Sequence, residues 1–182
     1  MGVDIHVRLI KYDPSDNLWH ELKLYRKEKE EYKKVPLFEG RNSELFGIIT
    51  NEENEDDFGI FPCADIPLLS LDEELRKDID SHKEWCYGFK EVLLSDMKYY
   101  VEKYPTIPDY DVDWGNDWKY GDPKPQKDNP VKWFYDDCIS YASFAEGWHF
   151  GIDPYSRYKL IYWFDRSEGI KVPSLFFKNF ML

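Results

Sequence analysis

Alternation of apolar and polar residues near the start of the sequence is the feature that most limits its fold. Apolar side chains occupy every second position from residue 3 to residue 9, and mostly polar ones lie between them. Because successive side chains point to opposite faces of a strand, residues 3–11 are predicted to form a half-buried β-strand. Residues 18–25 alternate in the same way after the turn-forming residues 13–17, so we predict an N-terminal β-hairpin.

The later sequence predicts a further strand and two helices. Residues 158–164 are mostly apolar and aromatic, which indicates a buried strand. Residues 72–81 are predicted to be helical, with Ser70 as N-cap and Glu73 completing a capping box. Residues 88–104 place apolar side chains three and four positions apart, which predicts the longest helix. We therefore predict an α+β fold, mainly an antiparallel sheet with an N-terminal hairpin and a C-terminal strand, with helices packed on one face.

Other segments have no clear period. Residues 26–34 are a mixed-charge run, interpreted as a solvated helix end or an exposed loop. Residues 133–145 are apolar and aromatic, but they fit neither a strand nor a helix clearly. A length of 182 residues suits one domain over residues 1–182. An acidic, aromatic insert is predicted around residues 105–130, because proline and glycine interrupt every regular pattern there.

The charge balance limits the classes of partner. Lys and Arg number 24 and Asp and Glu number 36, which gives a formal net charge of −12. A net charge of this sign repels nucleic acid, so direct DNA binding is not expected. A basic partner fits better, and a merely soluble acidic protein is the alternative.

The cysteines and the apolar runs indicate a compartment. Cys63, Cys86 and Cys138 are odd in number and include no CxxC pair, so free thiols in a reducing compartment are predicted. The sequence begins without a signal-peptide pattern and contains no apolar run long enough to span a membrane. We expect a cytoplasmic protein that does not bind membranes.

Four polar residues are candidates for catalysis. Asp4 and His6 are two residues apart on one predicted strand and therefore share a face, while His82 and Asp165 come from elsewhere in the chain. The four could bind a divalent metal or form an acid–base pair. A buried polar network, in which a carboxylate orients the imidazoles, is the interpretation we favour. No enzyme, nucleotide-binding or zinc motif is present, so we predict no metal and no cofactor and favour a role other than enzyme.

Arg41 and Asn42 are candidates for anion binding. They follow Gly40 and precede a short predicted helix that Asn42 or Ser43 could cap. An arginine beside a helix N-terminus can hold a phosphate. The alternative is structural: Arg41 could tie its loop to the carboxylate of Asp4.

The insert contains the best candidate for a surface that binds a partner. Carboxylates spaced along the chain can occupy sites that hold phosphates on a basic protein, and Trp and Tyr are typical of binding hot spots. The alternative is a solvated loop whose aromatic side chains fold back onto the core. The candidate residues are Asp109, Tyr110, Asp111, Asp113, Trp114, Asp117 and Trp118.

Short stretches carry a resemblance to a known family. They are Met1-Gly2-Val3-Asp4-Ile5-His6, Arg41-Asn42-Ser43-Glu44-Leu45-Phe46, His82-Lys83-Glu84-Trp85 and Tyr162-Trp163-Phe164-Asp165. Through them the sequence resembles a family of phage proteins that begin Met-Gly-x-Asp-Ile-His. In the third stretch the His-to-Trp spacing is shorter than the family pattern, and residues 105–156 have no counterpart. In length, acidity and phage character the chain also resembles the larger type II-A anti-CRISPR proteins, although no motif is shared.

The resemblance implies a function and a partner. It implies an anti-defence protein in the host bacterial cytoplasm that inhibits a Cas9-type nuclease, with the nuclease and its guide RNA as partner. Such nucleases hold nucleic acid in basic channels, where an acidic ligand can compete. One alternative is a small phosphate- or nucleotide-processing enzyme that uses the Asp and His residues. Another is a module that binds a nucleotide signal near Arg41.

Overall fold

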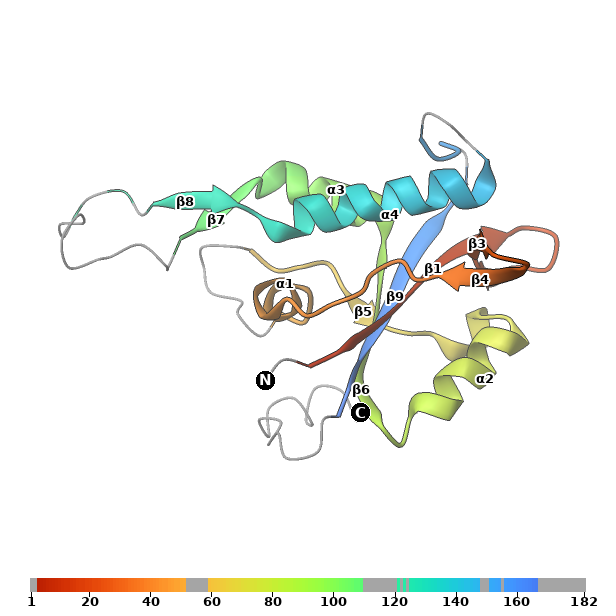
Figure 1. Cartoon of the computed structure of the whole chain (residues 1–182). Coiled ribbons are helices and arrows are strands. Elements are labelled where there is room, and N and C mark those ends of the chain that lie inside the picture. The colour runs from red at the N-terminus through yellow and green to blue at the C-terminus, as the bar shows by residue number, and fades with distance from the viewer. Residues whose placement is uncertain are drawn as a thin grey trace.

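The computed structural model describes residues 3–51, 59–109, 121, 123, 125–147, 151–154 and 156–166. These residues form a five-stranded sheet with the order β2-β1-β9-β6-β5, in which all neighbours are antiparallel (Figure 1). The strands are β1 (Ile5–Asp13), β2 (Leu18–Glu21), β5 (Ala64–Asp65), β6 (Cys86–Leu93) and β9 (Tyr158–Asp165). The predicted α+β class, with its mainly antiparallel sheet, N-terminal hairpin and C-terminal strand, is confirmed.

Both faces of the sheet are buried, because β1 and β9 carry apolar side chains on both sides. Val7 and Leu9 of β1 pack into a larger core cluster, whereas Ile10 packs into a smaller core cluster on the opposite face. Tyr162 of β9 belongs to the larger cluster and its neighbour Trp163 to the smaller one. Alternation along each strand therefore divides the core into two layers, one on each side of the sheet.

Helices cover both faces, which corrects the prediction that they pack on one face. The helices are α1 (Ser43–Ile49), α2 (Glu73–His82), α3 (Leu94–Lys103) and α4 (Pro130–Glu146). In Figure 1, α1, α3 and α4 lie on one side of the sheet and α2 lies on the other. Leu75 and Ile79 of α2 pack into the smaller cluster with Ile161 and Trp163. This second layer is needed because the apolar side chains of β9 on that face would otherwise be exposed to water.

The helix predicted at 88–104 is wrong in its first part. Strand β6 extends into this range, and α3 begins only at Leu94. Gly88 has a φ of 71° and lies at a register shift in the ladder between β6 and β9. The bulge changes the face on which later side chains lie, so that Tyr87 packs with the larger cluster and Phe89 with the smaller one. It therefore hides the alternation by which a strand is recognised.

Helix α2 lies close to its predicted range but has a different cap. The carboxylate of Asp72 accepts a hydrogen bond from the backbone N–H of Leu75 at 2.8 Å. Asp72, rather than the predicted Ser70, is therefore the N-cap. Ser70 instead donates its hydroxyl to the carbonyl of Pro67 within the 3-10 turn η1 (Leu68–Ser70).

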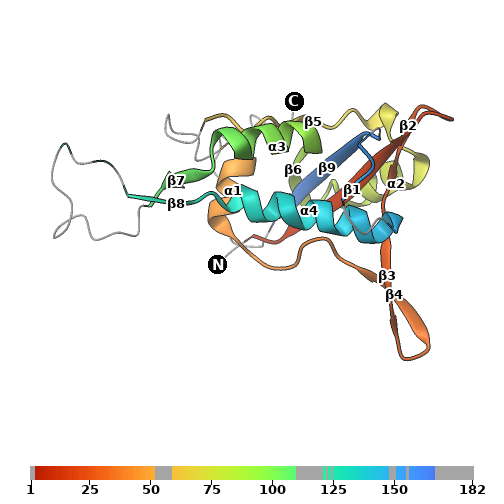
Figure 2. The same ribbon diagram turned by 90° about the horizontal axis from the view of Figure 1, so that it is seen from above.

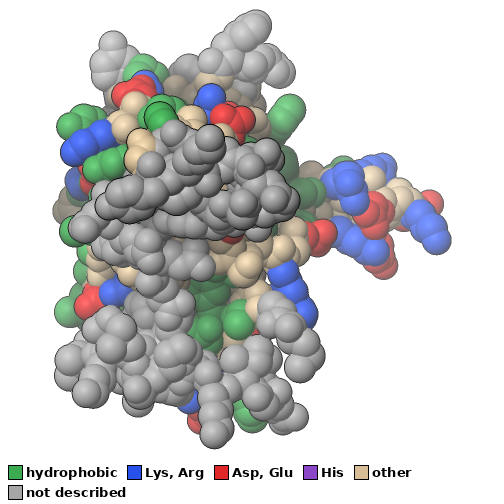
Figure 3. All heavy atoms as spheres, turned by 90° about the vertical axis from the view of Figure 1, so that its left-hand side faces the viewer, with side chains coloured by type: hydrophobic (Ala, Val, Ile, Leu, Met, Phe, Trp, Pro, Cys, Tyr) green, Lys and Arg blue, Asp and Glu red, His purple; other side chains and the backbone are tan. Residues whose placement is uncertain are grey.

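A hairpin of β3 (Leu24–Glu28) and β4 (Glu31–Val35) projects from the body of the protein (Figure 2). Residues 26–34, interpreted from the sequence as a loop or helix end, therefore form most of a two-stranded ladder. They contain five basic and three acidic side chains, a local charge of +2 (5 − 3). Figure 3 shows these mixed charges on the projection. Since both faces of the hairpin are mostly exposed, no alternation marks it in the sequence.

The predicted insert leaves and rejoins the body through another hairpin, formed by β7 (Thr106–Pro108) and β8 (Gln126–Asp128). The β7–β8 hairpin extends away from the layer of α3 and α4 (Figure 1). The backbone N–H of Asp109 donates to the carbonyl of Pro125 at 2.7 Å, which continues the ladder by one bond. Within the described ranges, no helix has the length and apolar character needed to cross a membrane.

Candidate His–Cys–Asp site

His6 and Asp165 meet although they are 159 positions apart in the sequence. His6 lies in β1, Asp165 ends β9, and the antiparallel register pairs His6 with Trp163. Asp165 is two residues beyond Trp163, so His6 and Asp165 share a face of the sheet. The Nε2 atom of His6 lies 2.6 Å from Oδ1 of Asp165, which is a short, charge-assisted hydrogen bond. Two of the four candidate residues are therefore in direct contact.

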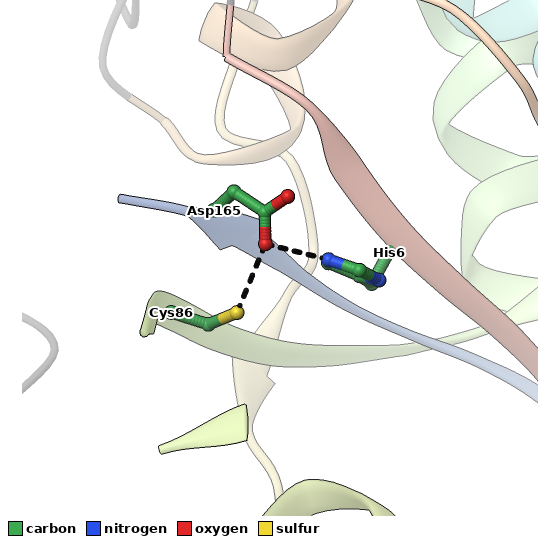
Figure 4. A group of neighbouring side chains, drawn as sticks. All are labelled: His6, Cys86 and Asp165. Atoms are coloured by element: carbon green, nitrogen blue, oxygen red, sulfur yellow. Dashed lines mark hydrogen bonds and ion pairs between the residues drawn. The ribbon is translucent and has the colours of Figure 1, made fainter. Parts of the chain in front are cut away.

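Cys86 is a third member, which the sequence did not single out for this site. It begins β6, and the ladder with β9 places it directly opposite Asp165. Its thiol donates to Oδ1 of Asp165, the same oxygen that His6 contacts, at an S···O distance of 3.2 Å (Figure 4). Burial raises the pKa of the Cys86 thiol to about 12, and the hydrogen bond and charge of Asp165 add to this effect. In this state the thiol is protonated at neutral pH, so it is not an activated nucleophile.

His82 approaches the same group from α2. Its ring centroid is 4.8 Å from that of His6, at an interplanar angle of 55°. The Nδ1 atom of His82 lies 2.7 Å from the backbone carbonyl oxygen of Asp78, one helical turn earlier. This contact holds Nδ1 toward the backbone of α2, so that Nε2 lies on the opposite side of the ring.

Trp163 forms the buried floor of the site. Its ring stacks on that of His6 at 5.9 Å and contacts the ring of His82 at 5.4 Å. The guanidinium of Arg8 lies 5.2 Å from the centre of the Trp163 ring, and its Nε donates to Asp78 at 3.1 Å. Packing on Trp163 therefore positions both imidazoles, and the backbone carbonyl of Asp78 orients that of His82.

Asp4 lies beside this cluster, with its backbone carbonyl accepting from the N–H of Asp165 at 3.0 Å, but its carboxylate is directed to another partner. Its carboxylate binds Arg41, with Arg41 Nε to Oδ1 at 2.6 Å and Nη2 to Oδ2 at 3.3 Å. The Arg41 hydrogen bond and charge lower the pKa of Asp4. Arg41 thus makes the structural contact that the sequence left open as an alternative. Asn42 is the N-cap of α1, with its side chain accepting from the N–H of Leu45 at 2.9 Å.

The candidate residues for partner binding fall mostly outside the described ranges. Asp109 lies at the end of β7, where its backbone bonds to Pro125. The residues of this set that lie outside are Tyr110, Asp111, Asp113, Trp114, Asp117 and Trp118.

A second group of potential metal ligands lies in the turn between β1 and β2. It consists of Asp13, Asp16 and His20. His20 Nε2 is 2.7 Å from Asp16, and Nδ1 is 2.8 Å from Asp72. Both ring nitrogens are therefore already engaged by carboxylates. The predicted free thiols are confirmed, since Cys63, Cys86 and Cys138 form no disulfide.

A hollow of about 240 Å³ borders the edge of β1, and His6, Arg8, Lys34 and Phe38 contribute to its lining. Cys86 and Asp165 are not among the residues that line it. Comparison of the chain with protein-family models, with curated proteins and with solved structures finds no match.

Proposed function

We propose that this chain is a phage-type anti-defence protein that inhibits a Cas9-type nuclease by binding the nuclease or its guide RNA complex. The observation that carries the proposal is the anchored β7–β8 hairpin, whose strands flank the acidic, aromatic segment in the sequence. The Asp109–Pro125 hydrogen bond of 2.7 Å holds the two ends of this segment together. A segment with fixed ends loses less conformational entropy on binding than a free one.

The base of the hairpin is attached to the body at several points. Ile107 is only 2% exposed and belongs to the larger core cluster. Lys127 forms an ion pair of 3.0 Å with Glu44 of α1. The buried side chain of Asn129 donates to the carbonyl of Tyr104 at 2.9 Å. These contacts fix the base of the hairpin to the body of the protein, which favours a role for the segment between its strands in binding.

The composition of the segment suits a basic partner. Residues 109–122 carry five Asp and one Lys, a local charge of −4 (1 − 5), together with two Trp and two Tyr. Carboxylates can compete for cationic sites that otherwise hold phosphates, and aromatic side chains supply contact area at low entropy cost. The net charge of −12 favours competition with nucleic acid over binding to it. The resemblance of residues 1–6 and 41–46 to phage proteins gives the proposal its biological setting.

The test is a DNA cleavage assay with a purified type II CRISPR nuclease, guide RNA and target DNA. The chain is added before guide loading, after guide loading, or after target binding, and the guide RNA is examined on the same gel. We expect loss of cleavage, and the order of addition identifies the channel that is blocked. Full cleavage in the presence of a large excess of the chain, with several such nucleases, would contradict the proposal.

A charge-matched pair of variants tests the role of the segment. Asp111→Asn, Asp113→Asn and Asp117→Asn together remove three charges from it, and we expect weaker inhibition with a smaller dependence on salt. The control removes three charges from exposed positions in and after α2, namely Glu73→Gln, Asp80→Asn and Glu84→Gln. Equal inhibition by the two triple variants would argue against a specific role for the segment.

A second candidate function is a phosphate- or nucleotide-processing enzyme, and one observation favours it. His6 is hydrogen-bonded to Asp165 at 2.6 Å and also borders the hollow at the edge of β1. In such an enzyme His6 would move a proton and Asp165 would orient its imidazole. Turnover of nucleotides or oligoribonucleotides by the chain, lost in His6→Gln and Asp165→Asn and retained in His20→Gln, would establish it. The nucleotide-binding alternative at Arg41 has no such support, because Arg41 pairs with Asp4.

A further inference from the structure

Three different ligand atoms from three neighbouring strands converge at one point. His6 Nε2, Cys86 Sγ and a carboxylate oxygen of Asp165 all lie within 4.8 Å of one another. From this geometry we infer that His6, Cys86 and Asp165 bind a zinc ion. The inference is independent of the proposed inhibitor function, because it concerns the end of the central sheet and not the β7–β8 hairpin.

The spacing of the ligand atoms is close to that of a zinc site. Zinc–ligand bonds of about 2.0–2.3 Å in a tetrahedron place neighbouring ligand atoms roughly 3.5 Å apart. The Cys86–Asp165 distance of 3.2 Å is near this value. The His6–Asp165 distance of 2.6 Å must lengthen by about 1 Å, which small side-chain rotations allow. The three residues start from paired strands of one sheet, so the backbone need not rearrange.

The chemistry of the three groups selects zinc over magnesium or calcium. Thiolate and imidazole are ligands that zinc prefers, whereas magnesium and calcium prefer oxygen. A thiolate, a carboxylate and a neutral imidazole together balance the charge of a divalent ion. In the present arrangement Asp165 Oδ1 accepts hydrogen bonds from both His6 and Cys86. Zinc binding would release the thiol proton of Cys86 to solvent, whereas neutral His6 would keep its one proton, then at Nδ1, so that Nε2 offers its lone pair to the ion.

The site has a buried side and an open side. Cys86 is only 2% exposed, whereas the side chains of His6 and Asp165 are 29% and 40% exposed. An ion can therefore enter past His6 and Asp165 and be held against the thiolate. Three protein ligands and one open position are typical of a zinc ion that binds a water molecule. The ring of His82 packs against that of His6, with 4.8 Å between the ring centroids, and so helps to orient this ligand.

The exposed group in the turn between β1 and β2 is the rival for zinc. His20 offers an imidazole there, but Asp16 and Asp72 engage both of its nitrogens. The group has no thiol, and two of its members are carboxylates. His20→Gln is therefore the matched control for His6→Gln.

The experiment measures zinc binding by the full chain after removal of metal with a chelator. Competition with a chromophoric chelator gives the zinc affinity and the number of ions bound. We expect one high-affinity zinc ion, with affinity reduced by at least ~100-fold in His6→Gln and Cys86→Ser and by about 10-fold in His82→Gln. His20→Gln should bind zinc as the unchanged chain does. No zinc bound by the unchanged chain, or affinity lost in His20→Gln and kept in Cys86→Ser, would overturn the inference.

A second measurement needs no variant at the site. X-ray absorption of zinc bound to the full chain should show one sulfur ligand at about 2.3 Å and the remaining ligands as nitrogen or oxygen. The same spectrum in Cys63→Ser assigns the sulfur to a cysteine other than Cys63. A spectrum without sulfur would overturn the inference even if a ligand variant failed to fold.

Discussion

The Nδ1 atom of His82 lies 2.7 Å from the carbonyl oxygen of Asp78, and this contact fixes the tautomer of the neutral imidazole. A carbonyl oxygen can only accept a hydrogen bond, so Nδ1 carries the proton and Nε2 keeps a lone pair. We expect long-range ¹H–¹⁵N spectra of the metal-free chain to show the Nδ1–H tautomer for His82. His20, whose two nitrogens both face carboxylates, is the internal comparison. Signals of an Nε2–H tautomer at His82 would contradict this geometry.

Asp72 is expected to contribute to stability as the cap of α2. Asp72→Ala removes the acceptor for the N–H of Leu75 and should lower the free energy of unfolding by about 1 kcal/mol. Asp72→Ser should restore the capping part of this loss but not the contribution of the ion pair with His20. The control is Ser70→Ala, which alters an exposed hydroxyl bound to Pro67 and should change stability by less than ~0.5 kcal/mol. Urea denaturation of the variants measures the difference, and an equal loss in Asp72→Ala and Ser70→Ala would show that the cap is misassigned.

His20 should make stability depend on pH near neutrality. Burial lowers the pKa of His20, but the hydrogen bonds and charges of Asp16 and Asp72 outweigh burial and raise it above its usual 6.5. A raised pKa in the folded state means that the protonated ring stabilises the fold. This stabilisation is complete below about pH 6.5 and is lost as pH rises through the higher folded-state pKa.

We therefore expect the urea midpoint to fall between about pH 6 and pH 8. In His20→Gln this part of the fall should disappear, because Gln does not titrate. A pH profile unchanged by His20→Gln would show that other groups cause the dependence.

Alanine substitutions at two glycines should distinguish the cost of a steric clash from the cost of backbone strain. Gly59 and Gly147 have similar positive φ angles of 67° and 73°. A Cβ at Gly59 would overlap the ring of Tyr104, whereas a Cβ at Gly147 would meet nothing within 4 Å among the described residues. Gly147→Ala should cost about 1 kcal/mol from strain alone. Gly59→Ala should cost at least ~1 kcal/mol more, because Tyr104 packs against the larger core cluster. Equal costs in thermal or urea denaturation would mean that Tyr104 moves aside freely.

The sequence predicted those parts of the fold in which one face is buried and the pattern is regular. The alternation in residues 3–11 and the apolar run at 158–164 correspond to β1 and β9. The pattern failed at β6, where the bulge at Gly88 interrupts alternation, and in the exposed β3–β4 hairpin, which has no buried face. It was also unclear in α4, because exposed Trp133 and Phe144 lie among the buried residues and blur the helical period.

The candidate site was predictable only in part, for a related reason. His6 and Asp165 were identified because each lies on a recognisable strand. Cys86 was missed, because its role depends on the register between β6 and β9, and most of β6 lies in the range that was predicted to be helical. The period of the strand placed Asp4 on the same face as His6. The carboxylate of Asp4 instead pairs with Arg41, and no local sequence pattern predicts the position of the loop that carries Arg41.

Strand β9 lies between β1 and β6 in the middle of the sheet, although it follows both in the chain. During synthesis, β1 with β2 and β6 with β5 therefore emerge as separate pairs whose inner edges have no partner. The contact between His6 and Asp165 closes a loop of 159 residues, so the entropy of closing that loop must be overcome before the sheet is complete. Folding is accordingly expected to be slow for a chain of this size. A nascent chain that stalls before residue 158 presents two apolar strand edges at once, and such edges readily pair with other chains.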